Sequence, residues 1–305
     1  MIAEVLAHGL RATVEPDPWC YDEAFGRHRG LLSIAEQEKL RGSCVAIAGL
    51  GGVGGSHLAT LARLGIGAFH IADPDVFEVA NFNRQHGADV STMGRSKAAV
   101  MADQARRINP AATLTVWAEP ILPANVADFL DGVDLLVDGI DFFALETRRL
   151  LFREARRRGI WAVTAAPLGF STSWLVFDPR GMSFDEYFDL HDGQERLQQL
   201  VAFAVGLAPQ ATHRGYLDLG HVDVQAGRGP SAGLACQLCA GVAAAEVLKI
   251  LLGRGPLRAA PWYSQFDAYR QQFRKGYLRC GNRHPWQRLK RWWLLRRLRM
   301  ESGRS

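Results

Sequence analysis

A glycine cluster stands between a short apolar run and a helix-forming segment in the stretch VAIAGLGGVGGSHLATLARLG, residues 45–65. Residues 43–49 predict a buried strand, and the spacing of apolar side chains over residues 53–64 predicts a helix. Glycines at a strand-to-helix turn permit a tight bend and let backbone N–H groups approach a phosphate at the positive end of the helix. The candidate nucleotide-binding residues at this turn are Gly49, Gly51, Gly52 and Gly54. The cluster alone does not distinguish NAD from ATP, or either nucleotide from a turn without a ligand.

The alternation of strands and helices continues to residue 166. Further strands are predicted at residues 66–72, 113–118, 134–140 and 160–166, and further helices at residues 95–109, 125–132 and 142–159. This order predicts an α/β protein with a doubly wound, mostly parallel Rossmann-like sheet. In the C-terminal half, antiparallel strands are predicted at 170–179, 261–269 and 271–280, and helices near 194–205 and at 232–252. The irregular segment 179–230 is expected to face the acceptor substrate.

The composition is that of an ordinary globular protein. Of the 305 residues, 48% are hydrophobic and 22% are charged. No apolar run is expected to reach the roughly 20 residues that span a bilayer. The N-terminal residues lack the pattern of a signal peptide, and five cysteines are too few for a disulfide framework. We therefore expect a cytoplasmic protein.

Polar residues after the glycine cluster indicate which chemistry the site would perform. Asp73 follows the second predicted strand, where a carboxylate accepts hydrogen bonds from ribose hydroxyls in NAD and ATP sites alike. Arg84 and Lys97 would stabilise the charge of a leaving pyrophosphate, which a hydride-transferring enzyme does not need. Asp141 ends a strand and suits Mg²⁺, and it equally suits the N-cap of the helix predicted to begin after it. Nucleotidyl transfer is therefore favoured over hydride transfer.

These residues lie in the motifs GxGGxG, DxDxxxxxNxxRQ, GxxK and DxxD, in that order. The combination resembles the ubiquitin-activating-enzyme-like (E1-like) superfamily of ThiF, MoeB and HesA, and it is also similar to the tRNA threonylcarbamoyladenosine dehydratases. The likeness covers roughly residues 24–170 and, more weakly, residues 232–280.

The resemblance implies a role for each motif residue. The glycines would form the nucleotide loop and Asp73 would hold the ribose. Asn81, Arg84 and Lys97 would contact phosphates, and Asp141 would bind Mg²⁺. Arg84, Lys97 and Asp141 are thus the implied catalytic residues. The family likeness also implies a homodimer, in which Arg27 or Arg29 reaches the ATP of the partner subunit.

An ATP- and Mg²⁺-dependent adenylyltransferase of the ubiquitin-like modifier activating type is the expected function. Its acceptor would be a carboxylate, expected to be the C-terminal glycine of a ubiquitin-like or small carrier protein. A tRNA-modifying dehydratase is the alternative within the same class. An NAD-binding oxidoreductase and a non-catalytic nucleotide-binding scaffold remain as further alternatives, the latter because Phe142 replaces the Asn or Ser usual in the family.

The cysteines argue against a thioester step, because none lies between Cys44 and Cys236, where the family places a nucleophile. Cys236 and Cys239 lie near the start of a long helix, which would stabilise a thiolate. We favour the alternative that both are small buried residues. Cys20 and Cys44 are expected in the core. A structural zinc site is not expected, although its ligands would be Cys236, Cys239, Cys280 and His284.

Two further segments are interpreted from their composition. Residues 182–195 either bind a basic or peptide-like acceptor or form a solvated loop with aromatic anchors, and we favour the loop. Residues 283–305 contain eight Lys and Arg against one acid, which is +7 and leaves −2 for the remaining chain. This tail either docks on the domain or contacts a membrane surface or nucleic acid through Trp292 and Trp293. The predicted organisation is an N-terminal extension (1–23), an adenylation domain (24–282) and the basic tail.

Overall fold

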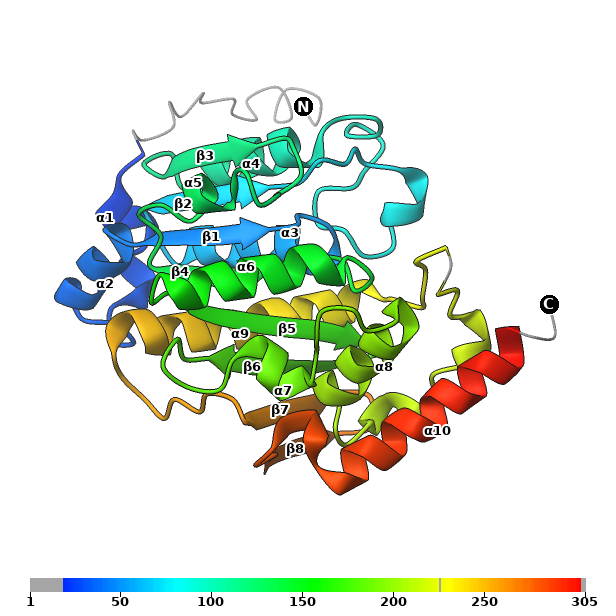
Figure 1. The fold of residues 1–305 in the computed structure, drawn as a ribbon. Coiled ribbons are helices and arrows are strands. Elements are labelled where there is room, and N and C mark those ends of the chain that lie inside the picture. Colours follow the sequence, from blue (N-terminus) through cyan, green and yellow to red (C-terminus); the bar gives the residue numbers. More distant parts are fainter. Residues whose placement is uncertain (1–18, 225, 303–305) are drawn as a thin grey trace, which may run out of the picture.

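The computed structural model describes residues 19–224 and 226–302, so most of the predicted N-terminal extension and the last three residues of the tail lie outside it. Its centre is an eight-stranded sheet of order β3-β2-β1-β4-β5-β6-β7-β8 (Figure 1). The parallel strands are β1 (Cys44–Ala48), β2 (Ala68–Ala72), β3 (Thr113–Trp117), β4 (Leu135–Asp138) and β5 (Trp161–Leu168). The antiparallel strands are β6 (Ser171–Phe177), β7 (Trp262–Asp267) and β8 (Gln272–Tyr277). This arrangement confirms the predicted fold class.

Strand order reverses at β1, which pairs with β2 on one side and with β4 on the other. After β1 the chain continues to β2 on one side, and after β4 it continues to β5 on the other side. Doubly wound sheets bind ligands beyond the carboxyl ends of strands at such a reversal. The glycine cluster follows β1 directly. The fold therefore places this cluster at the position where doubly wound sheets bind ligands.

Helices cover both faces of the sheet, and alternate strand residues point to one face or the other. Val45 and Ile47 of β1 face a core shared with α3 (Gly52–Arg63), α4 (Lys97–Ile108) and α9 (Gly233–Leu252). Ala46 and Ala48 face the second core. Its helices are α5 (Val126–Phe129), α6 (Leu145–Arg157), α7 (Phe184–Phe188) and α8 (Arg196–Leu207).

Helix α9 corrects the expectation that no segment could span a bilayer. By length and composition, its 20 residues would suffice. However, the helix packs against α3, β5 and β6, and half of its most apolar window is buried inside the protein. It is a core helix of this fold.

The N-terminal helices lie at the amino edge of the sheet, away from the glycine cluster (Figure 1). They are α1 (Tyr21–Ala24), η1 (Gly26–His28) and α2 (Ile34–Arg41). Short helices η2 (Val79–Asn81), η3 (Thr212–Gly215), η4 (Leu219–His221) and η5 (Gly281–Arg283) occupy connections, and α10 (Pro285–Ser302) ends the described chain. Cys20 is exposed, so its predicted core position is wrong, and Cys44 is only half-buried.

Candidate nucleotide site

The glycine turn is shaped by close backbone approach. Gly49 has φ +83°, and a Cβ there would lie 2.3 Å from the Gly139 carbonyl oxygen. A Cβ on Gly54 would lie 1.7 Å from the Gly49 carbonyl oxygen. Larger residues cannot occupy either position, so the turns after β1 and β4 touch through glycines. Gly139 was not predicted as a site residue, because the strand was expected to run over 134–140, whereas β4 ends at Asp138.

Helix α3 begins at Gly52 with Gly51 as its N-cap, and none of the described side chains caps it. The first N–H groups of a helix have no partner within the helix, and they carry the positive end of its dipole. This helix start therefore offers a candidate anion site at the carboxyl end of β1.

Asp73, which follows β2, is buried and bonded to the glycine turn. Its Oδ2 accepts a hydrogen bond from the Leu50 amide at 2.6 Å, and its Oδ1 accepts one from the Asp75 amide at 2.9 Å. Burial raises the pKa of Asp73 above its ordinary value, and the two backbone hydrogen bonds oppose that rise. The carboxylate thus holds the glycine turn in place, in addition to any contact with a ribose.

Lys97 is the first residue of α4, and its ammonium group lies 3.0 Å from Asp75 Oδ2. The lysine side chain is 8% exposed, whereas that of Asp75 is 66% exposed. Asp75 therefore joins Lys97 to Asp73 through successive contacts. The buried lysine and the glycine turn belong to one connected group of residues.

Asn81 and Arg84 lie in the segment after β2. Asn81 is buried, and its Oδ1 accepts a hydrogen bond from the Glu78 amide at 2.9 Å, which shapes the turn. The Arg84 guanidinium donates to the Ala80 carbonyl at 2.8 Å. A Cβ on Gly52 would lie 3.7 Å from Arg84 Cγ and Cδ, so the arginine stem lies beside the start of α3.

Asp141 is exposed, and its Oδ1 accepts a hydrogen bond from the Phe143 amide at 2.9 Å. It is not the N-cap of the following helix, because α6 begins at Leu145 with Ala144 as its N-cap. The aromatic residues at 142 and 143 form a turn before the helix, which makes the predicted helix start wrong by three residues.

Asp138 and Arg148 form a buried ion pair beside the turn at residues 139–144, and the sequence analysis did not identify them. Arg148 Nε donates to Asp138 Oδ2 at 2.8 Å, and Thr164 donates to the same oxygen at 2.7 Å. The arginine also donates to the Ile140 carbonyl, and its guanidinium lies 4.6 Å from the centre of the Phe203 ring. The pairing spans ten residues, and no spacing rule reveals it.

The side chains that could bind a metal ion are carboxylates, histidines and cysteines near the glycine turn. Among the residues that the structure describes, no group of three or more His, Cys, Asp or Glu side chains could hold an ion. Mg²⁺ in nucleotide sites needs only one or two carboxylates, since substrate phosphates and water supply the remaining ligands. The single exposed carboxylate of Asp141 fits that requirement.

Cys236 lies at the glycine turn, since a Cβ on Gly52 would be 3.1 Å from its sulfur. Burial raises the pKa of Cys236 to about 11, against the opposing charge of Arg84. Cys239 is also buried, and its sulfur lies 3.1 Å from the Thr172 hydroxyl. The favoured prediction of two small buried residues is confirmed, whereas Cys280 is exposed.

His57 is a buried titratable group beneath the site that the sequence analysis missed. It lies on α3, it is 1% exposed, and neither ring nitrogen has a hydrogen-bond partner in the described chain. Burial lowers its pKa to about 4, and the charge of Asp138 opposes that shift. The imidazole is therefore neutral at physiological pH.

Two other predicted regions lie away from the glycine turn. Arg27 and Arg29 are exposed at the amino edge of the sheet. Within segment 182–195, residues 184–188 form α7, whose aromatic side chains are buried in the core. Acids of this segment pair with α6, because Asp185 lies 2.9 Å from Arg149 and 2.6 Å from Arg153. The predicted aromatic anchors are thus confirmed, and residues 189–195 form a loop, whereas residues 184–188 form a helix that was not predicted.

Comparison with known proteins gives a family match over most of the chain. The ThiF family model matches residues 25–287. A tRNA threonylcarbamoyladenosine dehydratase of Haemophilus influenzae is 33% identical over 153 residues, which is 50% of this chain and 58% of that protein. The probable adenylyltransferase/sulfurtransferase MoeZ of Mycobacterium tuberculosis is 28% identical over 227 residues, 73% of this chain and 51% of that protein. The chain thus spans little more than half the length of these relatives.

Solved structures share the fold. The E. coli tRNA N6-threonylcarbamoyladenosine dehydratase TcdA is 25% identical with a TM-score of 0.55, covering 76% of this chain and 95% of TcdA. A further structure of the same E. coli enzyme is a complex with ATP.

Proposed function

The chain belongs to the ThiF family, and we propose that it is an ATP-dependent adenylyltransferase that activates a carboxylate as an acyl-adenylate. The observation that carries this proposal is the uncapped start of α3 at a glycine turn, with Asp73, Arg84 and Lys97 arranged around it. An NAD-binding oxidoreductase would leave the buried Lys97 and the neighbouring Arg84 without a role.

In this proposal, the phosphates of ATP lie against the first turn of α3 and the ribose lies near Asp73. The acceptor carboxylate attacks the α-phosphorus, and the bond to pyrophosphate breaks. Arg84 and Lys97 stabilise the charge on the departing pyrophosphate, and the site contributes mainly position and electrostatics. Asp141 would hold Mg²⁺, which would neutralise phosphate charge when bound. A side-chain nucleophile is not required, so the unreactive environment of Cys236 is no obstacle.

We further propose a carboxylate on a modified adenosine of tRNA as the acceptor. Relatives named tRNA threonylcarbamoyladenosine dehydratase support this choice over the carrier protein that we first expected, and so does the basic helix α10. The carrier-protein acceptor remains the second candidate because of the likeness to MoeZ and to the adenylyltransferase and sulfurtransferase UBA4 of Saccharomyces cerevisiae. A homodimer that brings Arg27 or Arg29 to a partner's ATP remains a prediction.

The test is ATP–pyrophosphate exchange, measured with bulk tRNA and with a small carrier protein ending in glycine. We expect exchange that depends on tRNA, and we expect Asp141→Ala and Arg84→Ala to reduce it by about 100-fold or more. Asp103→Ala is the matched control, because this exposed acid on α4 forms a surface ion pair with Arg107 and lies outside the candidate site.

Thermal unfolding separates nucleotide binding from turnover. ATP·Mg²⁺ at about 100 times its dissociation constant should stabilise the fold by roughly 2.7 kcal/mol, and NADH should not. Stabilisation by NADH alone would overturn the proposal in favour of an oxidoreductase. Stabilisation by ATP without exchange for any acceptor would favour the non-catalytic scaffold.

A further inference from the structure

Three aromatic rings, here termed the ring platform, pack together beyond the strand ends: Phe170, Tyr216 and Tyr269. Phe170 and Tyr216 are stacked with ring centroids 5.4 Å apart, and Tyr269 lies 5.5 Å and 5.3 Å from them. The Tyr216 hydroxyl donates to Asp267 at 3.0 Å and accepts from the Phe170 amide at 3.1 Å. Tyr269 is 69% exposed. Two rings are thus held in place while the third faces solvent.

The ring platform lies at the same edge of the sheet as the glycine turn. Strands β1, β4 and β5 are parallel and all end there, and the turn carrying Phe170 follows β5. The pairing of Ser171 with Asp267 brings the turn of Tyr269 beside it. Three strand spacings separate β1 from β6, which is about 14 Å. A molecule that reacts at the glycine turn and extends along this edge would therefore cross the ring platform.

A second group of rings, Trp292 and Trp293, lies on α10 and is connected to the platform segment through Arg214. This arginine is two residues before the platform's Tyr216, and its guanidinium lies 4.9 Å from the centre of the Trp293 ring. Arg296 lies 5.6 Å from the Trp292 ring centre. Trp292 and Trp293 are 56% and 42% exposed. Each tryptophan thus combines an exposed ring with a neighbouring cation.

The opposite face of α10 attaches the helix to the domain. Gln287 is buried and donates to the Val205 carbonyl on α8 at 3.1 Å. Arg291 pairs with Asp189 at 2.6 Å. These contacts hold α10 along α8, and the contact of Trp293 with Arg214 adds to them. The exposed faces of both tryptophan rings are accessible to a ligand.

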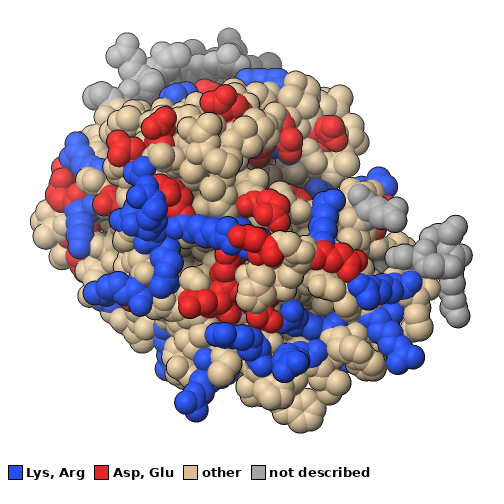
Figure 2. All heavy atoms as spheres, in the orientation of Figure 1, with Lys and Arg blue, Asp and Glu red and all other residues tan. Residues whose placement is uncertain are grey.

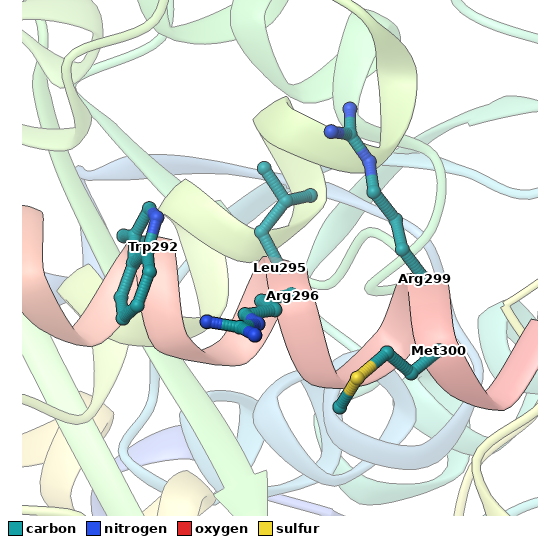
Figure 3. Close-up of a pocket in the computed structure, with 5 residues that line it drawn as sticks. All are labelled: Trp292, Leu295, Arg296, Arg299 and Met300. Carbon is teal, nitrogen blue, oxygen red and sulfur yellow. The ribbon is translucent and has the colours of Figure 1, made fainter.

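The outer side of α10 is hollowed and cationic. Five residues of α10 border a shallow surface hollow, and Figure 3 shows their side chains: Trp292, Leu295, Arg296, Arg299 and Met300. Of the two arginines, Arg299 also pairs with Glu195. In Figure 2, Lys and Arg side chains gather along the lower right of the molecule, where Figure 1 places α10. The surface therefore offers flat rings and positive charge together.

We propose that the ring platform, Arg214 and the outer side of α10 form a binding surface for an unpaired, single-stranded segment of RNA. Its bases would stack on the exposed rings and its phosphates would contact the arginines. The charge of +7 on residues 283–305 is complementary to a polyanion. A lipid surface would involve α10 alone and leave the ring platform without a role. We rest this inference on the proposed function, because the RNA would carry the carboxylate to the glycine turn.

The test is binding of a short fluorescent RNA without secondary structure, measured by anisotropy with the full chain and without nucleotide. Trp292→Ala combined with Trp293→Ala should weaken binding by about tenfold or more, and Tyr269→Ala by about fivefold. Tyr269→Phe should bind like the parent chain because it keeps the ring. The matched controls are Tyr277→Ala, an exposed ring at the other end of β8, and Arg106→Ala on α4; neither should change the affinity.

Thermal melts confirm that each variant folds. Unchanged affinity of the tryptophan and Tyr269→Ala variants would overturn the inference, and so would equal affinity for fully double-stranded RNA. Selective binding to anionic phospholipid vesicles or to a carrier protein, with no binding of RNA, would also overturn it. The absence of nucleotide separates this result from the proposed function: RNA binding without pyrophosphate exchange would refute only the latter.

Discussion

The Leu50 amide donates a hydrogen bond to Asp73 Oδ2 at 2.6 Å, which joins the glycine turn after β1 to the end of β2. Both groups are buried, so loss of the acceptor leaves an unpaired N–H group. We expect Asp73→Ala to lower the free energy of unfolding by about 1–3 kcal/mol and to reduce stabilisation by ATP. Urea unfolding measures the first effect. Asp73→Asn keeps an acceptor and should cost less; equal loss in both variants would contradict the hydrogen-bond explanation.

Substitution of Gly54 tests the close approach of the two turns. A Cβ on Gly54 would overlap the Gly49 carbonyl, so Gly54→Ala must displace the backbone of the nucleotide loop. We expect loss of ATP-induced stabilisation in thermal melts. Gly241→Ala is the control on α9, where a Cβ meets nothing within 4 Å and should add up to about 1 kcal/mol of stability. Normal ATP binding by Gly54→Ala would contradict this account of the loop.

The buried pair of Arg148 and Asp138 makes a third prediction. Arg148→Met leaves the Asp138 carboxylate buried without its cation, which should cost about 3–5 kcal/mol in urea unfolding. Adding Asp138→Asn removes the unpaired charge and should restore part of that loss. Arg107→Met, at an exposed pair on α4, should change stability by less than about 1 kcal/mol. Without recovery in the double variant, the cost would not be electrostatic.

His57 predicts a pH dependence of stability. Its folded pKa of about 4 lies below the ordinary value of 6.5, so the unfolded chain binds more protons between these values. The free energy of unfolding should therefore decrease as the pH falls from about 6.5 towards 4, and protonation of His57 in the unfolded chain should account for roughly 3 kcal/mol of that decrease. Chemical denaturation of the parent chain and of His57→Leu between pH 7 and pH 4 would measure the difference. Parallel pH curves would contradict the assignment.

Much of the fold could be predicted because the strands carry their own pattern. Residues 45–48 alternate between two cores, and the glycines that end β1 mark the turn. In segment 182–195 the aromatic anchors were predicted, but the helix that carries them was not. Phe184, Tyr187 and Phe188 have the spacing of one helix face, and a capping box at Ser183 starts that helix.

The candidate site was predictable as a set of motifs but not as a set of contacts. Lys97 was expected at phosphates, yet its partner Asp75 lies 22 residues earlier, and an antiparallel bridge between Val76 and Ser96, outside the sheet, brings them together. Arg148 and His57 carried no signal, because buried pairing and burial without a partner depend on the surrounding fold. Local spacing identifies residues that act along one element, whereas contacts between elements require the tertiary structure.

The start of α9 has a consequence for binding at this site. A Cβ on Gly233 would lie 2.9 Å from the Asn83 carbonyl oxygen. One turn later, the sulfur of Cys236 lies so close to Gly52 that a Cβ on that glycine would be 3.1 Å from it. The chain enters this helix just after segment 179–230, which the sequence analysis expects to face the acceptor. A displacement of the start of α9 would therefore be transmitted to the start of α3 at Gly52. Under the proposed function, an acceptor that contacts this segment would therefore also affect the phosphate contacts at the start of α3, so that acceptor binding and nucleotide binding would be coupled.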